Sequence, residues 1–593
     1  MRSRSSTRGN LDEGACSLVA LKSVETGYDE AKQMPAVNAA TLFIVQGSDC
    51  SDFLYPKTTA CVPWIGDSIA MPPAAVEHQG QTELNLPISS NERVTFMRLE
   101  TTGAISRRNI HSSEKLGSCF PALSLSILLL SCCFGTACGG GPSSSSQIIK
   151  SPPPPPPPAG CTSGPNAAPL RPATSLRPRA SSPATQGAIP AAYFGFNLHP
   201  GVFNGQIPYP TIPFGAVRLW AAETTWNDLN PSNGVYDWTN LDTALNVAIG
   251  KGQTDFIYTF GFVPAWAQNR NDEVCDHYPG SCDPPSDLNA DGTGSDLLWQ
   301  NFVTAVVARA AGRIHTWEIW NEPDILVEWN GTPAQMARMA KDAYTIIKAA
   351  DPTALVTTPT PGDDGTGQNI NSWEPAYLAA LLPLGGVFAD IITYHGYSDA
   401  CNSQVPESAE SSKLSDLTQA ISQSPLSASL ASLPIWNTEG SWNKDAGLPD
   451  PNMQAAYVGR MYLLQWSMGV SRFYWFQYGN TQNGTFLNSD NSLNLAGTAY
   501  GQVYGWMVGA TLTNPCAASG TVWTCGFTSS GGVQEQAVWD TSQSCSNGSC
   551  TTSSHSPSST YTEYYDLAGD PPTPISGSVQ IGAEPILLTS AKL

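Results

Sequence analysis

Short apolar runs alternate with longer stretches of helical periodicity from about residue 190 onward, and this alternation restricts the fold more than any other feature of the chain. Apolar runs bounded by turn residues are typical of buried strands, whereas Thr332–Ala350 and Asn452–Met468 have the period of helices. Such an alternation favours a (β/α)8 barrel, which we place at residues 189–505. Its predicted strands are Tyr193–His199, Ala216–Trp220, Asp255–Phe262, His315–Glu322, Leu355–Pro361, Asp390–Tyr397, Pro434–Gly440 and Arg472–Tyr478.

The sequence changes character again beyond residue 505, where Thr, Ser, Gly and Val predominate and the helical period is lost. Strands are predicted at Gln536–Trp539, Tyr561–Asp566 and Val579–Ile581. We therefore expect a small C-terminal β-sandwich domain at residues 506–593, packed on the barrel.

Three segments precede the barrel. Residues 111–138 hold a short apolar run, which follows basic residues and ends in small residues before a cysteine. The run is too short to span a bilayer comfortably and resembles a bacterial lipoprotein signal, with Cys138 as the expected lipidation site and Cys132 as the alternative. Residues 139–188 form a Ser- and Pro-rich linker. Residues 1–110 are interpreted as an upstream extension, either mis-assigned through an early start codon or disordered.

The charge balance excludes one class of partner. Only 13% of residues are charged and the net charge is −21. A negatively charged chain does not attract the negatively charged phosphate backbone, so no nucleic acid is expected as a partner. The 17 Trp and 20 Tyr residues suit flat, uncharged ligands such as sugar rings, although most aromatic rings pack in cores.

The chain has 15 cysteines, too many for a typical cytosolic enzyme, and several lie close together in sequence. Disulfides, and hence an oxidising compartment, are expected. We predict an exported protein, either a cell-surface or periplasmic lipoprotein or a secreted one. The short-range pairs are Cys275 with Cys282, Cys516 with Cys525, and Cys545 with Cys550, which leaves Cys161 and Cys401 as a long-range pair.

No metal or other cofactor is predicted. No CxxC pair with partner ligands is present, which argues against zinc. Asp287, Asn289 and Asp291 alternate as calcium ligands do, but the spacing lacks the terminal bidentate Glu.

Two glutamates are placed for carbohydrate chemistry. Cleavage of a glycosidic bond needs one carboxylic acid to protonate the leaving oxygen and one carboxylate on the opposite face of the sugar. In a barrel enzyme, residues at the C-terminal ends of strands line the active site. Glu322 ends the fourth predicted strand and Glu439 ends the seventh.

The segment His315-Thr-Trp-Glu-Ile-Trp-Asn-Glu-Pro-Asp324 closely resembles the acid/base motif of the large clan of retaining glycosidases with barrel folds. Across residues 190–590 the chain is most similar to glycoside hydrolase family 39, the β-xylosidases and iduronidases. Its seventh strand, Trp436-Asn-Thr-Glu-Gly440, is more similar to family 5.

The resemblance implies a role for each site residue. Glu322 would be the acid/base and Glu439 the nucleophile. Arg218 would donate to the nucleophile, and Asn321 would bind the sugar 2-hydroxyl. The remaining positions implied are His395 and Tyr397 beside the nucleophile, and Trp475 and Trp266 as sugar platforms.

The resemblance also implies double displacement through a glycosyl-enzyme, with a poly- or oligosaccharide as substrate. We expect a monomer that a lipid anchor ties to a membrane. The alternative is a carbohydrate-binding surface lipoprotein without catalysis. Sugar identity, linkage and endo or exo cleavage depend on loops that a single sequence does not decode.

Overall fold

The computed structural model describes strands 16–25 and 38–47 and, from residue 187 to 590, every residue except 221, 271, 276, 363–368 and 480–481. The chain divides into two units, Met1–Ser146 and Gln147–Leu593. In the first, β1 (Cys16–Glu25) pairs antiparallel with β2 (Asn38–Gly47). Both strands fall within residues 1–110, whose interpretation as an upstream extension stays a prediction. Cys138 and Cys132 lie outside the described residues.

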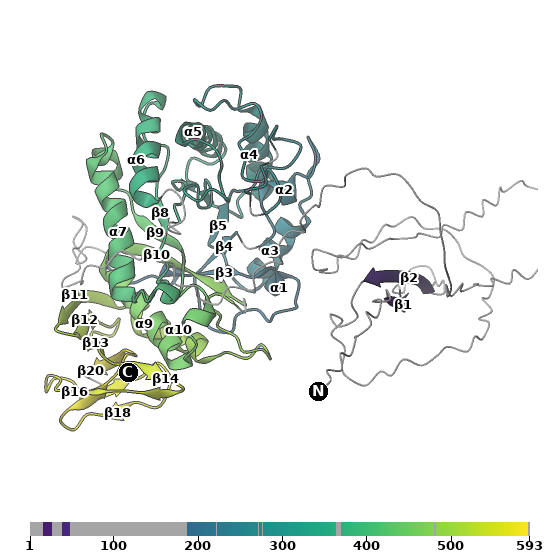
Figure 1. Cartoon of the computed structure of the whole chain (residues 1–593). Helices are drawn as coiled ribbons and strands as arrows, with labels where there is room; N and C mark the ends of the chain where they lie inside the picture. The colour runs from purple at the N-terminus through teal and green to yellow at the C-terminus, as the bar shows by residue number, and fades with distance from the viewer. Residues whose placement is uncertain are drawn as a thin grey trace, which may run out of the picture. The chain divides into compact units, whose positions relative to one another are not determined.

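The second unit contains the predicted barrel of eight parallel strands (Figure 1). The sheet order is β7-β6-β5-β4-β3-β10-β9-β8, and a parallel bridge between Thr357 and Ile391 joins the two ends. All eight predicted strands are confirmed. They are β3 (Phe194–Leu198), β4 (Ala216–Leu219), β5 (Phe256–Thr259), β6 (Thr316–Glu318), β7 (Leu355–Val356), β8 (Ile392–His395), β9 (Ile435–Gly440) and β10 (Val470–Tyr478).

Seven of the strands are followed by a helix of at least twelve residues, whereas β3 leads only into the short α1 (Pro200–Phe203). The predicted helices 332–350 and 452–468 are confirmed to within a residue at each end. The long helices are α3 (Thr239–Gly250), α4 (Leu297–Ala310), α5 (Pro333–Ala350), α6 (Ile370–Leu381), α7 (Pro406–Gln423), α9 (Pro451–Ser467) and α10 (Leu495–Met507); α2 (Trp226–Leu229) and α8 (Ser427–Leu430) are single turns.

Local sequence explains where the helices begin. Thr332 caps α5, because its hydroxyl accepts from the backbone N–H of Gln335 while the Gln335 side chain accepts from the Thr332 N–H. Pro333 fits the first helical position. Helix α9 begins in the same way behind Asp450, whose carboxylate accepts from Asn452 N–H.

The barrel strands are buried on both faces, so they read as continuous apolar runs. A small cluster of Ala216, Ile257, Ile391, Trp436 and Tyr474 fills the barrel interior, and a much larger core lies between the strands and the helices. Polar residues replace apolar ones at the C-terminal ends of the strands, and this end of the barrel carries the site.

The C-terminal region is the predicted β-sandwich. Its main sheet is antiparallel with order β11-β12-β13-β20-β17-β18, and the pair β16-β19 packs against it around Val538, Val579 and Ile581. The strands are β11 (Thr511–Ser519), β12 (Val522–Thr528), β13 (Gln534–Asp540), β14 (Cys545–Ser546), β15 (Ser549–Cys550), β16 (Ser553–His555), β17 (Glu563–Tyr565), β18 (Thr573–Pro574), β19 (Val579–Ile581) and β20 (Ile586–Thr589).

Helix α9 lies between the barrel and this domain. All of its residues from Ala455 to Ser467 are buried, as expected of a helix covered on every side. Arg460 of α9 pairs with Glu407 of α7, and the same carboxylate accepts from the indole N–H of Trp539 in β13 at 2.7 Å. The two domains are therefore joined by a hydrogen bond from β13 to a buried ion pair between two barrel helices.

Three predicted disulfides are confirmed: Cys275–Cys282, Cys516–Cys525 and Cys545–Cys550. Cys401 is also disulfide-bonded, and Cys161 lies outside the described residues.

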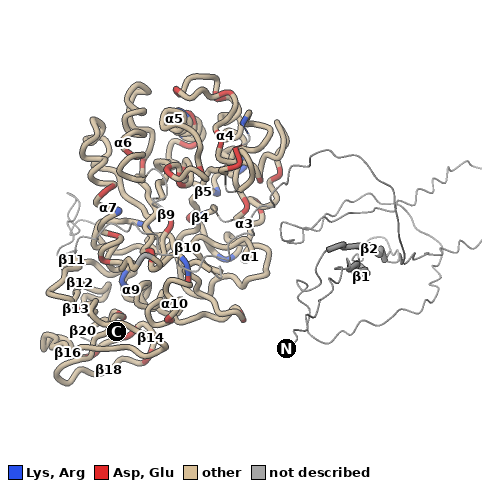
Figure 2. Tube along the Cα trace, in the orientation of Figure 1, with Lys and Arg blue, Asp and Glu red and all other residues tan. Residues whose placement is uncertain are grey.

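Lys and Arg are sparse along the trace (Figure 2). Within the described ranges, none of the helices combines the length and the apolar character needed to cross a membrane.

Candidate active site

Arg218 of β4 lies at the centre of the site and is fully buried. Its Nε donates to Glu318 Oε2 of β6 at 2.6 Å, its Nη1 donates to Glu439 Oε1 of β9, and its Nη2 donates to Asn321 Oδ1 at 2.8 Å. Guanidinium donors form a rigid planar fork. One side chain therefore fixes the relative positions of three strand ends.

Opposite charges compensate one another at the base of the site. Burial alone would lower the pKa of Arg218, but the charges of Glu318 and Glu439 outweigh burial and raise it. Burial alone would raise the pKa of Glu318, but Arg218, His395 and the hydroxyl of Thr259 hold it below its usual value. Glu318 is therefore a buried partner of Arg218 at the base of the site.

His395 at the end of β8 bridges the two predicted catalytic glutamates. Its Nδ1 lies 2.7 Å from Glu322 Oε1 and 3.6 Å from Glu439 Oε2. One oxygen of each glutamate and a ring nitrogen of His395 all lie within 4.8 Å of one another. Burial lowers the pKa of His395 to about 4, so the imidazole is neutral at neutral pH.

Tyr397 follows His395 and completes the surroundings of Glu439. Its hydroxyl donates to Glu439 Oε2 at 2.6 Å, while Arg218 holds the other oxygen. Burial, followed by the charge of Glu439, raises the pKa of Tyr397 well above its usual value, so it stays a donor. The structure thus brings together five of the predicted site residues, Glu322, Glu439, Arg218, His395 and Tyr397, with Asn321 beside them.

Glu322 is placed differently from the prediction. Strand β6 ends at Glu318, and Glu322 follows an isolated bridge between Asn321 and Thr360 instead of ending the strand. Its φ is +44°, in the left-handed region, and its N–H donates to Thr360 O. The Glu322 side chain lies against Gly362, where a Cβ atom would stand 2.4 Å from its Oε1. The backbone turn, and not strand alternation, directs Glu322 toward Glu439.

Trp475 is a correction. Its ring is fully buried, stacks on Phe486 at 4.9 Å and Tyr462 at 6.2 Å, and its Nε1 donates to Gly484 O. The Trp475 ring therefore lies on the outer face of β10, against α9, and has no free face for a sugar. Side chains alternate along a strand, so the next residue, Phe476, points inward.

Phe476 is only partly buried, and its ring centroid lies 6.4 Å from that of Tyr397. This ring, which sequence reasoning missed, is the aromatic residue of β10 that faces the site. Trp266 is also partly buried, and its Nε1 donates to Asn230 O at 2.7 Å. Its role as a platform stays a prediction.

Three polar residues that support the site were also missed. Asn197 of β3 accepts from Arg218 Nη1 at 3.2 Å, and the hydroxyls of Thr259 and Thr360 donate to Glu318 at 2.6 and 2.7 Å. Each lies at or near the C-terminal end of an apolar strand: Thr259 ends β5, Asn197 precedes the last residue of β3, and Thr360 follows β7. A polar residue in that position is the sequence pattern that could have found them.

Among the described residues, three groups have the spacing of metal ligands: the two glutamates with His395, and two groups that each contain a disulfide. In the loop considered for calcium, Asp291 Oδ1 accepts from both N–H and hydroxyl of Thr293. The Arg338 guanidinium donates to Gly292 O and Gly294 O at 3.4 and 3.5 Å. An arginine therefore takes backbone oxygens that a calcium ion would need.

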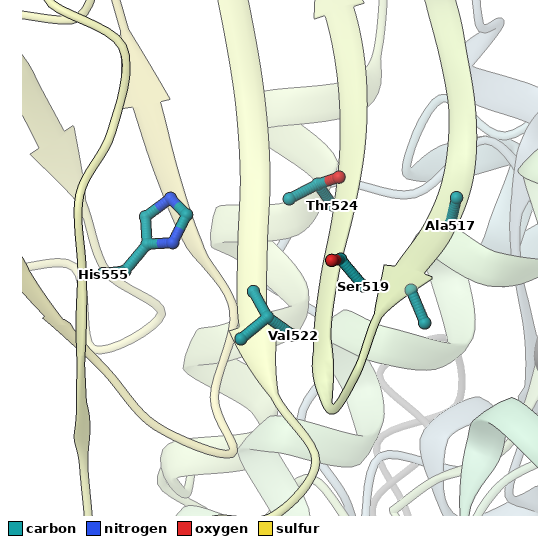
Figure 3. Close-up of a pocket in the computed structure, with 6 residues that line it drawn as sticks. Ala517, Ser519, Val522, Thr524 and His555 are labelled. Carbon is teal, nitrogen blue, oxygen red and sulfur yellow. The ribbon is translucent and has the colours of Figure 1, made fainter.

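A hollow of about 370 Å³ lies in the C-terminal domain, between β11, β12 and His555 (Figure 3). The other lining residues are Ala517, Ala518, Ser519, Val522 and Thr524, and all of these except Ala518 are labelled in the close-up. It contains no pair of carboxylates, so it lacks the chemistry assembled around Arg218.

Residues 235–500 match the family model described as the glycosyl hydrolase catalytic core, and the match includes both glutamates. Residues 235–500 are therefore similar to a glycoside hydrolase catalytic core. The glycosidase activity and the barrel fold predicted from the sequence are confirmed.

Solved structures similar to this glycosidase include a family 39 glycoside hydrolase from Bacteroides cellulosilyticus WH2, at 19% identity and a TM-score of 0.49 over 68% of this chain and 82% of that chain. A monomeric β-xylosidase from Caulobacter crescentus CB15 is 16% identical with a TM-score of 0.47, over 68% and 97%. A family 39 enzyme from Xanthomonas axonopodis pv. citri is 18% identical with a TM-score of 0.46, over 68% and 95%.

Proposed function

We propose that this glycosidase retains the anomeric configuration of its substrate, with Glu439 as nucleophile and Glu322 as acid/base. The observation that carries the proposal is the proximity of the two glutamates, which have carboxylate oxygens within 4.8 Å of each other. Retaining enzymes separate the two carboxyl groups by about 5–5.5 Å, whereas inverting enzymes leave about 6.5–9.5 Å for a water molecule.

The surroundings of Glu439 suit a nucleophile. Arg218 and Tyr397 each hold one of its oxygens, so the carboxylate is oriented before the sugar arrives. Its side chain is only 6% exposed, which keeps bulk water from competing with those contacts.

The surroundings of Glu322 suit a group that gives and takes a proton. Its side chain is 18% exposed, more than that of Glu439, and so is open to a leaving group or water. The neutral His395 places no positive charge beside it. The Nε2 atom of His395 has no hydrogen-bond partner in the described part of the chain, so Nδ1 is free to donate to a carboxylate or accept from a carboxylic acid.

The reaction follows in two steps. Glu439 attacks the anomeric carbon, the bond to the leaving oxygen breaks, and Glu322 gives that oxygen its proton. Glu322 then takes a proton from water, which attacks the same carbon and releases Glu439. Asn321, held by Arg218, would bind the sugar 2-hydroxyl, and Phe476 and Trp266 would contact sugar rings.

We further propose that the enzyme is exported and acts on a poly- or oligosaccharide outside the cytoplasm. The disulfides support an oxidising compartment. The lipoprotein signal at residues 111–138, the lipid on Cys138 and the linker 139–188 complete this proposal. Family 39 is the proposed affiliation.

The test is an assay of the purified protein against aryl glycosides and polysaccharides, beside Glu439→Ala and Glu322→Ala variants. Loss of activity in Glu439→Ala, with recovery of turnover in azide as an inverted glycosyl azide, would support the assignment. Full activity in Glu439→Ala would refute it. Sugar binding without turnover by the wild type would favour the alternative of a binding lipoprotein.

A further inference from the structure

Three aromatic rings extend outward from Arg218 along one side of the site. The Trp220 ring lies 6.0 Å from the guanidinium carbon of Arg218. Phe262 follows at 5.2 Å from Trp220, and His277 stacks on Phe262 at 4.7 Å with the ring planes 9° apart. These three residues, here called the aromatic wall, come from the ends of β4 and β5 and from the loop closed by Cys275–Cys282.

The local backbone is built to hold these rings. Gly261 makes room for Trp220, because a Cβ atom there would stand 2.4 Å from the indole. Phe262 has a φ of +55°, a left-handed conformation that is costly for a bulky residue. Such strain concentrates at ligand sites and needs support from its surroundings.

The support comes from the disulfide loop. Val263 N–H, next to Phe262, donates to Ser281 O at 2.8 Å, and the Tyr278 hydroxyl donates to Val263 O. Ser281 precedes Cys282, so the loop that carries His277 is bonded directly to the strained turn that carries Phe262. The wall is therefore fixed in place at its outer end as well as at Arg218.

The outermost ring of the wall, His277, is the most exposed of the three. Phe262 is 8% exposed and Trp220 is partly buried, whereas His277 is exposed. The apolar faces of sugar rings stack on aromatic faces, and each step along the wall is comparable in length to a pyranose ring. Trp220 offers such a face beside Arg218, and His277 offers one at the outer end of the wall.

We propose that the aromatic wall binds the sugar residue adjacent to the one whose glycosidic bond is cleaved. The enzyme is then specific for oligosaccharides of neutral sugars over short aryl glycosides. This inference rests on the proposed function, because it takes the site around Glu439 as the point of cleavage.

The test compares His277→Ala and Trp220→Ala with the wild type on nitrophenyl monosaccharides and on xylo- and cello-oligosaccharides of increasing length. His277→Ala should lower kcat/KM for the oligosaccharides about fivefold to tenfold, mainly through KM, and change the nitrophenyl monosaccharide rates less than about twofold. Trp220→Ala should show the same selectivity.

Two controls separate stacking from folding. His277→Tyr keeps a ring and should retain the wild-type preference for length. Tyr344→Ala removes a partly buried ring of α5, away from the carboxylates, and should leave the preference unchanged. Equal losses on short and long substrates, or none, would overturn the proposal.

If the wild type hydrolyses none of these substrates, the proposed function is refuted for these sugars, independently of the aromatic wall. Calorimetric binding of the same oligosaccharides to the wild type and His277→Ala then decides the inference. Weaker binding by the variant would support the wall as a sugar site, and equal binding or none to either protein would overturn it.

Discussion

Replacing Gly362 by Ala should disable Glu322 while leaving the fold intact. A Cβ atom at position 362 would lie 2.4 Å from Glu322 Oε1 and 2.5 Å from its Cδ, whereas ordinary contact begins at 3.4 Å. The backbone cannot retreat easily, because Gly362 N–H donates to the buried Asp324 carboxylate at 2.8 Å. The Glu322 carboxylate must therefore move by about 1 Å, and a displacement of that size costs about a hundredfold in rate.

The leaving group identifies the step that is lost. In Gly362→Ala, the first step should slow about a hundredfold on a glycoside whose leaving group needs a proton, but little on a dinitrophenyl glycoside, whose leaving group needs none. Pre-steady-state release of the phenol measures this step. Gly250→Ala is the matched control, because a Cβ atom at the end of α3 has no neighbour within 4 Å.

Two results would refute this reasoning. Wild-type rates on both glycosides would mean that Glu322 does not depend on its contact with Gly362. Equal losses on both, with an unchanged unfolding temperature, would mean that the substitution disturbs something other than proton transfer.

Three further changes test the charges of the fold. Arg218→Gln leaves two buried carboxylates uncompensated and should lower the free energy of unfolding in urea by about 3–5 kcal/mol and abolish turnover. Burial raises the pKa of Glu374 and Glu410 to about 8, so both are protonated in the fold. The two protonated side chains stabilise the fold fully below their ordinary pKa of 4.5, and this stabilisation is lost as the pH rises toward 8. Calorimetry should therefore show an unfolding temperature that falls over this pH range. The fall should be smaller when both residues are replaced by Gln. Trp539→Phe removes a donor to Glu407 and should cost about 1–3 kcal/mol by chemical denaturation.

Much of the fold could be predicted because barrel strands and their helices have distinct periods. The Trp-Asn-Glu-Pro segment identified Glu322, and the apolar strand that ends in Glu439 identified its partner. What the sequence could not give was the backbone turn at Glu322, because a φ of +44° at a glutamate has no local sequence pattern.

Side-chain direction was the second limit. In β10, apolar residues occupy both faces, so alternation alone could not say whether Trp475 or Phe476 points inward. Trp220 was missed for a related reason: its place beside Arg218 depends on Gly261, which lies in the next loop along the chain. Such contacts between neighbouring strand ends exist only once the barrel has closed.

The anomeric configuration of the first product tests the central claim most directly. Proton NMR of a reaction followed from mixing, faster than the free sugar mutarotates, distinguishes the two anomers. Oxygens of Glu322 and Glu439 within 4.8 Å of each other predict that the product first appears with the configuration of the substrate. First appearance of the opposite anomer would contradict double displacement through Glu439.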